Sequence, residues 1–513
     1  MQNQRRYAQY MTPAPIARFM AGLFPRPQEQ ELRLLDPGAG LGSLSCALFE
    51  RFSAEPGLRH ISLDAYEIDP ALLAPLQANL SHCAAQAAAC HLTWQLHGSD
   101  FIHAASELLA SQSSLWPQPL PRYTHCIMNP PYKKLASSSS QRVSLRRAGI
   151  ETVNLYSAFV ALALLLLEDQ GLLLAIIPRS FCNGAYYLPF RRLLLSQAAI
   201  RHIHLFESRN SAFRNQQVLQ ENIIIMLQKG AAQGPVRISA SQDDSFSDLE
   251  QQLLPFEQVV KKNERQLFIH IPDPRRNPAL PTPEACRHSL DQLGIQVSTG
   301  PVVSFRLRRH LLQEPAPNSA PLLYPAHFKQ SRLHWPQPQG KRPNAIAINP
   351  ETKKHLFPGG YYVVLRRFSS KEEKRRLVAS LLDPALLPPN CQVSFENHLN
   401  VFHQNKKPLD KDLALGLTLY LNSSLLDQCF RSFSGHTQVN VSDLKTLPFP
   451  SRDKLKKLAA NCDPQQKPAQ EQIDQKIMEL LTPSVLDTSP CIQTTYRTTT
   501  AIRRTGQNTT ALP

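Results

Sequence analysis

The segment Asn129-Pro130-Pro131-Tyr132 carries residue types suited to a reaction at a planar amino nitrogen. The lone pair of such a nitrogen is delocalised, and two hydrogen-bond acceptors aimed at its hydrogens would make it more nucleophilic. The side-chain oxygen of Asn129 and the backbone carbonyl of Pro130 are the candidate acceptors, and Pro130 with Pro131 predicts a rigid turn. Tyr132 offers an aromatic face for a base turned out of a nucleic-acid stack. An ordinary proline turn is the alternative interpretation.

A glycine-rich stretch, Asp36-Pro37-Gly38-Ala39-Gly40-Leu41-Gly42, follows the first expected strand. Glycines between a strand and a helix let the backbone approach a nucleotide-like ligand closely. The order of residues departs from the GxGxxG dinucleotide fingerprint and better suits an adenosine ligand that bears methionine instead of a pyrophosphate. Asp36, Gly38 and Gly40 are therefore candidate cofactor-binding residues, with a tight turn as the alternative.

Carboxylates follow the next two expected strands. Glu67, with its neighbour Ile68, ends the second strand, where an acid can accept hydrogen bonds from both ribose hydroxyls, and we prefer it to Asp69. Asp100 and Phe101 follow the third strand and could contact an adenine amino group and ring. The alternative is that these acids only stabilise helix N-termini.

The elements that must position these residues alternate between strand and helix from Glu31 to about Gln228, which predicts an α/β domain with a mainly parallel sheet. Two late strands are close enough in sequence to pair antiparallel. The expected strands are Leu32–Leu35, Ile61–Ile68, His91–Leu96, Tyr123–Met128, Leu172–Ile177, Ile200–Phe206 and Asn222–Leu227, and the expected helices are Leu44–Phe52, Pro70–Ala89 and Leu155–Glu168.

The rest of the chain predicts further domains, as its length of 513 residues requires. We expect a catalytic domain at 1–228, a connecting region at 229–285, a mixed α+β domain at 286–450, and a helical segment with a disordered tail at 451–513. Basic residues of the third unit are candidates for phosphate or base contacts with DNA, although a solvated charged face is the alternative. They are Arg306, Arg308, Arg309, Lys329, Arg332, Lys341 and Arg342.

Composition favours a polyanionic partner, because 56 basic against 40 acidic residues give a formal charge of +16. The ten cysteines form no CxxC pair, so neither a metal site nor a disulfide framework is expected, and a reducing cytoplasm fits best. The N-terminus has no secretory signal. The longest apolar run, Ala158–Leu167, is too short to span a membrane.

The order of these motifs resembles the gamma class of adenine-N6 DNA methyltransferases, the TaqI-like enzymes of restriction-modification systems. The resemblance implies a Rossmann-like class I methyltransferase domain with a seven-stranded sheet, S-adenosylmethionine as cofactor, double-stranded DNA as substrate, and a C-terminal target-recognition domain. It also implies that Thr12 and Pro13 close over the methionine end of the cofactor. Asn129 would adjoin the cofactor as well as the base, and Phe213 would sandwich the flipped adenine with Tyr132.

One region departs from that family pattern. Ser137–Ser140 with Arg142, Arg146 and Arg147 predicts a mobile loop that closes on the DNA backbone, or a solvated loop.

A methyltransferase of the same fold acting on RNA or on a protein glutamine remains an alternative, as does a binding protein with a degenerate fold. Three C-terminal segments resemble recognition domains of such enzymes, namely Val297–Pro301, Leu323–Phe328 and Phe433–Asn440. No nuclease motif with strand context is found, so a cognate restriction endonuclease is expected on a separate chain.

Overall fold

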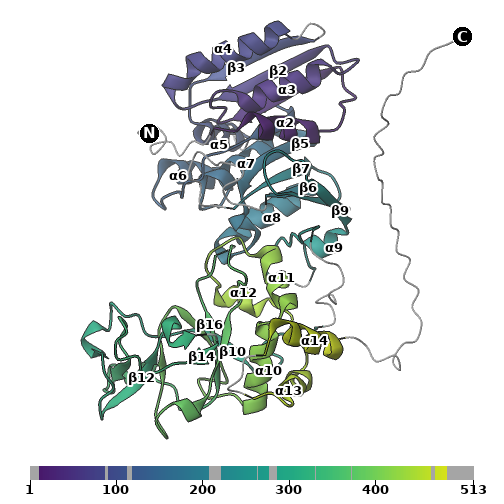
Figure 1. Ribbon diagram of the computed structural model, residues 1–513. Coiled ribbons are helices and arrows are strands. Elements are labelled where there is room, and N and C mark those ends of the chain that lie inside the picture. The colour runs from purple at the N-terminus through teal and green to yellow at the C-terminus, as the bar shows by residue number, and fades with distance from the viewer. Residues whose placement is uncertain are drawn as a thin grey trace, which may run out of the picture.

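The computed structural model describes residues 11–86, 90–112, 118–206, 221–262, 264–275, 286–329, 331–370, 372–463 and 468–481. Two bodies are stacked end to end (Figure 1). We call residues 11–275 the N-terminal body and residues 286–481 the C-terminal body. No helix in the described ranges is long and apolar enough to cross a membrane.

The N-terminal body is built on one sheet, for which the described residues give nine strands in the order β3-β2-β1-β4-β5-β7-β6-β8-β9. The pairs β1–β2, β1–β4, β2–β3, β4–β5 and β6–β8 are parallel, whereas β7 is antiparallel to β5 and β6. The strands are β1 (Glu31–Pro37), β2 (His60–Tyr66), β3 (His91–His97), β4 (Tyr123–Met128), β5 (Leu167–Pro178), β6 (Ala198–Phe206), β7 (Asn222–Lys229), β8 (Val236–Ser241) and β9 (Glu250–Leu254).

All seven expected strands are present, and the late pair is antiparallel as predicted. The boundary at Gln228 is wrong, because β8 pairs with β6 and β9 pairs with β8 beyond it. The expected connecting region therefore contributes two strands to the sheet, and its buried Val236, Ile238 and Ala240 cover what would otherwise be the open edge of β6. The helix expected at Leu155–Glu168 ends at Leu166, and Leu167 begins β5.

Helices cover both faces of this sheet because alternate strand residues point to opposite sides. Leu174 belongs to the core with α2 (Ala14–Leu23), α3 (Ser43–Ser53) and α4 (Pro70–Gln86). Its neighbour Leu173 belongs to the core on the other face. The helices of that face are α5 (Phe101–Ser111), α6 (Ser140–Arg147), α7 (Leu155–Leu166) and α8 (Leu188–Gln197).

The C-terminal body has mixed α+β structure, as expected. One sheet has the order β10-β19-β16-β17 and a smaller one β11-β15-β12-β18. The strands of the larger sheet are β10 (Gln296–Thr299), β16 (Tyr362–Arg366), β17 (Ala379–Leu382) and β19 (Leu399–His403), and those of the smaller sheet are β11 (Leu311–Leu312), β12 (Ser319–Leu323), β15 (Ala345–Ala347) and β18 (Ser394–Phe395). The chain leaves the larger sheet after β10 and returns at β16, so we call residues 300–361 the excursion.

Five helices lie beside the larger sheet in the described residues. They are α10 (Lys411–Leu421), α11 (Ser424–Phe433), α12 (Val441–Lys445), α13 (Arg452–Ala459) and α14 (Gln470–Leu481). Leu455 of α13 and Ile473 and Ile477 of α14 are buried in the same core as β10 and α10. The segment after Pro450 is therefore helical, as predicted, but it belongs to the C-terminal body rather than forming a separate unit. The expected disordered tail lies outside the described residues.

The two bodies are joined by hydrogen bonds at the end of β5. Arg179, paired with Glu221 at 2.8 Å, also donates to the carbonyl oxygens of Arg431 (2.7 Å) and Ser432 at the end of α11. The backbone N–H of Ile271 donates to the Ser432 carbonyl at 2.7 Å. Because Arg179 directly follows β5, the C-terminal body is fixed to the same sheet edge at which the chemistry-bearing motifs lie.

Candidate active site

A cavity of about 310 Å³ opens at the carboxyl ends of β1, β2, β3 and β4. Parallel strands bring their carboxyl ends to one edge, so segments distant in sequence meet there. The lining residues are Met11, Thr12, Gly38, Ala39, Gly40, Leu41, Ser43, Leu44, Tyr66, Glu67, Ile68, Ser99, Asp100, Phe101, Asn129, Pro131, Lys133, Lys134, Leu135, Ala136, Ser139, Gln141, Leu155 and Phe159. All four predicted motifs and the predicted N-terminal segment thus contribute lining residues, and Asn129 and Pro131 represent the tetrapeptide.

The glycine loop has a conformation that requires glycine. Gly38 and Gly40 have φ values of +80° and +59°, which other residues rarely adopt. The backbone N–H groups of Gly38 and Ala39 both donate to the Tyr66 carbonyl, at 2.8 and 2.9 Å, so β2 holds the loop in place. A Cβ on Gly40 would lie 3.2 Å from the sulfur of Met11, the residue before Thr12. The loop is therefore a shallow cradle with little room for side chains.

Glu67 lies at the cavity wall with only 2% of its surface exposed. Its carboxylate accepts hydrogen bonds from the backbone N–H groups of Gly40 (2.9 Å) and Asp69 (2.7 Å). These bonds fix the position of the carboxylate at the cavity wall. The geometry fits an acid that holds a vicinal diol, and it ties Glu67 to the glycine loop.

Asp36 lies beneath the glycine loop and does not line the cavity. It is fully buried, and its Oδ2 accepts a hydrogen bond from the Ser45 hydroxyl at 2.6 Å. Burial raises the pKa of Asp36 to about 7. Its Oδ1 has no hydrogen-bond partner within the described part of the chain. Asp36 thus supports the loop from below, which differs from the direct cofactor contact we expected.

Asp100 caps a helix, which is the alternative role considered for it, and it also lines the cavity. Its Oδ1 caps α5 by accepting from the N–H of Ile102 at 2.8 Å, and its Oδ2 accepts from Gln141 at 2.6 Å at the cavity wall.

Gln141 belongs to α6, which begins within the segment expected to be a mobile or solvated loop. That expectation is wrong, because Ser139 caps a regular helix that packs on α5, and Arg142 and Arg146 pair with Glu151.

The tetrapeptide Asn129-Pro130-Pro131-Tyr132 follows β4 directly. The Asn129 amide nitrogen donates to the Thr12 hydroxyl at 3.0 Å, and its Oδ1 accepts from the Tyr132 hydroxyl at 2.9 Å. The same Tyr132 hydroxyl lies 3.1 Å from the carbonyl oxygen of Ile176 on β5. Thr12 and Tyr132 therefore fix the plane of the Asn129 amide at the cavity wall. Tyr132 itself is half-buried and packs against the cores on both sheet faces.

The structure brings together most of the predicted site residues and separates a few. Thr12, Gly38, Gly40, Glu67, Ile68, Asp100, Phe101, Asn129 and Pro131 line the cavity. Pro13 occupies the N-cap position of α2, and Pro130 and Tyr132 are not among the residues that line the cavity. Phe213 lies outside the described residues. Sequence reasoning missed Lys133, Lys134 and Gln141, although their position directly after the tetrapeptide was a usable signal.

The basic residues predicted to contact DNA lie on the excursion and are exposed. Arg309 forms an exposed ion pair with Glu351, so part of its charge is already compensated. The ion pairs described in the structure do not include Arg306, Arg308, Lys329 or Arg332.

In the described ranges, no group of three or more His, Cys, Asp or Glu side chains is placed to hold a metal ion, and the nine described cysteines are free.

The strand order β3-β2-β1-β4-β5-β7-β6 with β7 antiparallel, and a cavity at the carboxyl edge behind a glycine loop, define a class I methyltransferase. Residues 101–213 match the Eco57I restriction-modification methylase family. The chain is 45% identical to the type II methyltransferase M.BsuBI of Bacillus subtilis, over 94% of this chain and 95% of that one. It is 41% identical to the type II methyltransferase M.PstI of Providencia stuartii, over 89% of each chain.

The chain therefore belongs to the type II methyltransferases of restriction-modification systems, which methylate DNA at specific sites. A solved type IIL restriction-modification enzyme, MmeI in complex with DNA, is similar with a TM-score of 0.49 at 13% identity, over 91% of this chain and 70% of that one. The family sets aside the alternatives of an RNA methylase, a glutamine methylase and a degenerate binding protein. It confirms the predicted resemblance to restriction-modification methyltransferases.

Proposed function

We propose that this enzyme transfers a methyl group from S-adenosylmethionine to N6 of an adenine turned out of duplex DNA. The observation that carries the proposal is the Asn129 amide, fixed by Thr12 and Tyr132 at the wall of a cavity behind the glycine loop. S-adenosylmethionine, when bound, supplies a methyl group that is already activated on a sulfonium. The chain then has to hold the amino group in line and exclude water.

The cavity residues fit that cofactor. Gly38 and Gly40 form the cradle for its methionine part, the Glu67 carboxylate suits the two ribose hydroxyls, and Asp100 with Phe101 suits adenine. At the target base, the Asn129 oxygen and the Pro130 carbonyl accept hydrogen bonds from the amino group, and the Tyr132 ring supports the base by stacking. Phe213 is the proposed second stacking residue. Because methylation protects a site from cleavage, we further propose a cognate restriction endonuclease on a separate chain.

Replacing Asn129 with Ala should lower the methylation rate by roughly 10³-fold, because one of two acceptors for the amino hydrogens is lost. Affinity for S-adenosylmethionine, measured by titration calorimetry, should change little. Tyr132→Phe keeps the ring but removes the hydroxyl that orients Asn129, so we expect a smaller fall in kcat with nearly unchanged KM for DNA. Near wild-type turnover by the Asn129→Ala enzyme would contradict the assigned role.

The modified base is tested by expressing the chain in a host that lacks adenine methylation. Mass spectrometry of the digested DNA should detect N6-methyladenine, and sequencing that detects modified bases should place it in one defined motif. Methylated cytosine, or no modified base at all, would overturn the proposed specificity.

A further inference from the structure

Three strands of the larger sheet of the C-terminal body meet at one end of that sheet, where β10 and β16 end and β19 begins. Strand β16 ends at Arg366, opposite Leu399 at the start of β19, and β10 ends at Thr299, opposite Asn400. Antiparallel pairing therefore places Arg367 and Phe368, which follow β16, beside His398, which precedes β19. The rings of Phe368 and His398 lie 5.1 Å apart, and the Arg367 guanidinium lies 5.9 Å from the Phe368 ring.

The loop after α11 runs along this same end of the sheet. Phe368 and Gln438 form an antiparallel bridge, with the N–H of Ser369 donating to the Thr437 carbonyl at 3.0 Å and the N–H of Val439 donating to the Arg367 carbonyl at 2.7 Å. We call Arg367, Phe368, His398, Thr437 and Gln438 the β16 edge. The name denotes the carboxyl end of β16, which is a central strand of the sheet, and not a lateral edge.

The β16 edge adjoins the active-site side of the N-terminal body. The N–H of Gly435 donates to the Asn183 side chain at 3.3 Å, and a Cβ at Gly435 would lie 2.8 Å from the carbonyl oxygen of Arg179. The next residue, His436, has its ring 6.5 Å from that of Tyr187. Lys134, which lines the cavity, is close enough to His436 to contribute to the lowering of its pKa, for which burial is the main cause.

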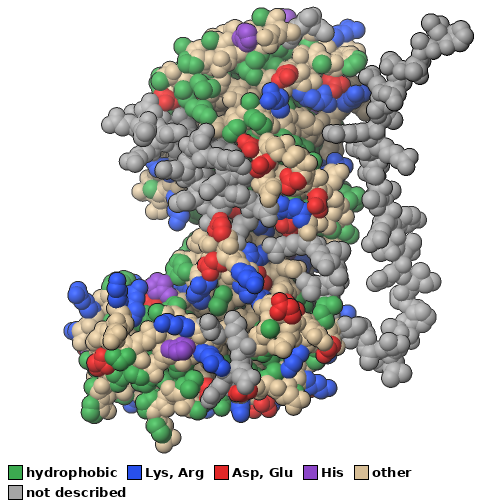
Figure 2. Space-filling view, viewed as in Figure 1, with side chains coloured by type: hydrophobic (Ala, Val, Ile, Leu, Met, Phe, Trp, Pro, Cys, Tyr) green, Lys and Arg blue, Asp and Glu red, His purple; other side chains and the backbone are tan. Residues whose placement is uncertain are grey.

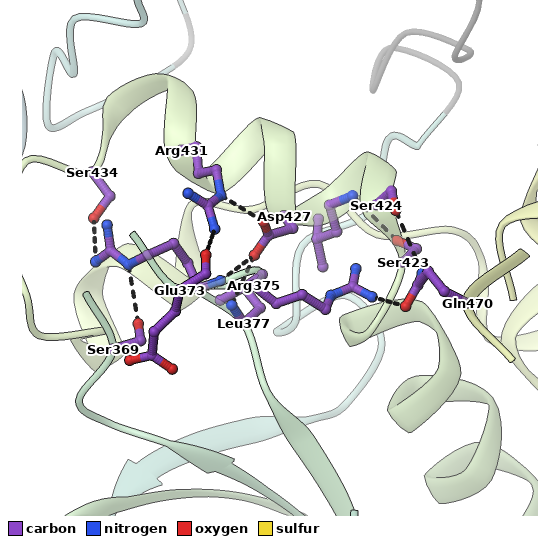
Figure 3. A network of polar contacts seen from close by, with 12 residues as sticks. Ser369, Glu373, Arg375, Leu377, Ser423, Ser424, Asp427, Arg431, Ser434 and Gln470 are labelled. Atoms are coloured by element: carbon purple, nitrogen blue, oxygen red, sulfur yellow. Dashed lines mark hydrogen bonds and ion pairs between the residues drawn. The ribbon is translucent and has the colours of Figure 1, made fainter. Parts of the chain in front are cut away.

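A buried arginine holds this loop in one conformation. Arg376 is 2% exposed, and its guanidinium donates to the hydroxyls of Ser369 (3.0 Å) and Ser434 (3.3 Å) and to the carbonyl of His436. In Figure 3, Ser369 and Ser434 converge on one guanidinium group, and Asp427 receives Arg431 beside it. Asp427 also accepts from the backbone N–H groups of Arg376 and Leu377, at 2.7 and 2.9 Å. A rigid loop costs little entropy when a ligand binds against it.

The chemistry of the β16 edge suits the bases of DNA. The Phe368 side chain is 39% exposed and that of His398 is 49% exposed, and Thr437 is also exposed. Arg367 is half-buried, and its guanidinium donates through one Nη to the Asn397 carbonyl at 3.2 Å, while no hydrogen bond is described for the other Nη in the described part of the chain. Arginine reads guanine, glutamine reads adenine, and threonine contacts the thymine methyl group. Figure 2 shows Lys and Arg side chains along the margin of the C-terminal body that faces the N-terminal body, which complements phosphate charge.

We propose that the β16 edge contacts the base pairs next to the flipped adenine and so determines sequence specificity, whereas the exposed arginines of the excursion contact phosphates. This inference rests on the proposed function, which places the target base at Asn129. Its ligand is duplex DNA entering between the two bodies, with the target base toward Asn129 and the neighbouring pairs against Arg367, Phe368 and Thr437.

The test compares two duplexes, one with the motif that the wild-type enzyme methylates in cells and one with a base pair beside the target adenine changed. Arg367→Ala and Phe368→Ala should each raise KM for the first duplex and lower the discrimination between the two by about 10- to 100-fold. Calorimetry should show unchanged cofactor affinity. Arg367→Lys keeps the charge but not the bidentate geometry, so it should restore non-specific binding without restoring discrimination.

Two exposed arginines provide matched controls. Arg308→Ala, on the excursion, should weaken binding to both duplexes equally, and Arg287→Ala, which precedes β10, should change neither. Thermal melting identifies any variant that fails to fold. The conservative Arg367→Lys variant then decides whether Arg367 contributes to discrimination between the duplexes. Wild-type discrimination by both Arg367→Lys and Phe368→Ala would overturn the proposal. Absence of methylated adenine with the wild-type enzyme would instead defeat the proposed function. The DNA affinity of the variants would still test whether the β16 edge contacts DNA.

Discussion

At the scale of single residues, the site combines groups that touch ligand space with groups that hold them. Asn129 and Glu67 line the cavity, and each is oriented by hydrogen bonds from a segment distant in sequence. Asp36 has the supporting role, buried under the glycine loop with its carboxyl bonded to Ser45. The motif pattern was sufficient to identify all three residues. It could not separate contact from support, because that distinction depends on which side of a strand end each side chain occupies.

The buried Asp36 predicts a specific dependence of stability on pH. Its carboxyl titrates near 3.8 in an unfolded chain and near 7 in the folded protein, so the folded state retains a proton that the unfolded state has lost. Stability should therefore fall as pH rises from about 4 to 7 and stay level above that range. Relative to Asp36→Asn, the wild type should lose roughly 2 to 3 kcal/mol between pH 5 and pH 8 in denaturant unfolding. Parallel pH profiles for the two proteins would exclude Asp36 as the source.

At the scale of elements, α8 secures the turn after β5 through one buried side chain. Arg191 is fully buried and donates to the backbone carbonyls of Phe181, Asn183, Gly184 and Gln266, at 2.8 to 3.0 Å. Burial lowers its pKa to about 10, so it keeps its charge at neutral pH. This turn carries Tyr187 and Asn183, which contact the C-terminal body.

Replacing Arg191 with Met should destabilise the protein by roughly 3 kcal/mol, because several buried carbonyls would lose their donor. A lower melting temperature in calorimetry would show this. Arg192 is the next residue on α8 and is exposed, so Arg192→Met should melt close to wild type. Equal melting temperatures for the two variants would contradict the role assigned to Arg191.

The elements also show where sequence patterns succeed and fail. Strands β1 to β7 are short apolar runs between turn signals, and each was predictable. Strands β8 and β9 were not predicted, although Val236, Ile238 and Ala240 alternate with polar residues, because these short runs lie in a segment rich in Gln and Ser. Their place in the sheet depends on long-range pairing of β8 with β6 and of β9 with β8. Helix α6 was missed because its serines indicate a loop until Ser139 is seen to cap it. The β16 edge was predicted only in part, since Phe433–Asn440 stood out in the sequence but its contact with residues near 367 and 398 depends on the fold.

At the scale of the whole molecule, the two bodies meet at a place where backbones touch. Gly435 packs so closely on Arg179 and Ser180 that any side chain would overlap their backbone atoms. This contact limits how closely the C-terminal body approaches the body that carries Asn129-Pro130-Pro131-Tyr132. Enzymes are sensitive to shifts of this kind, because a misplacement of about 1 Å can cost roughly 10²-fold in rate.

Gly435→Ala should therefore reduce DNA methylation by roughly 10²-fold while leaving cofactor affinity unchanged, because the bodies must move apart. Single-turnover methylation and calorimetry measure the two effects. Gly22→Ala is the control, since a Cβ there meets nothing within 4 Å. If Gly435→Ala methylated DNA at the rate of the control, the spacing of the bodies would not matter for catalysis.

The excursion of residues 300–361 has its own small core, which includes Ala320, Leu322 and Ile346. Both ends are fixed by glycines without room for a side chain, since a Cβ at Gly300 would lie 2.2 Å from the Glu396 carbonyl oxygen and one at Gly359 2.5 Å from that of Cys391. The excursion is also tied to the larger sheet, because β12 pairs with β18 and Leu323 and Phe357 share a core with Val364 of β16. If the exposed arginines contact phosphates as proposed, we expect the length of DNA covered to diversify in the part of the excursion farthest from that shared core.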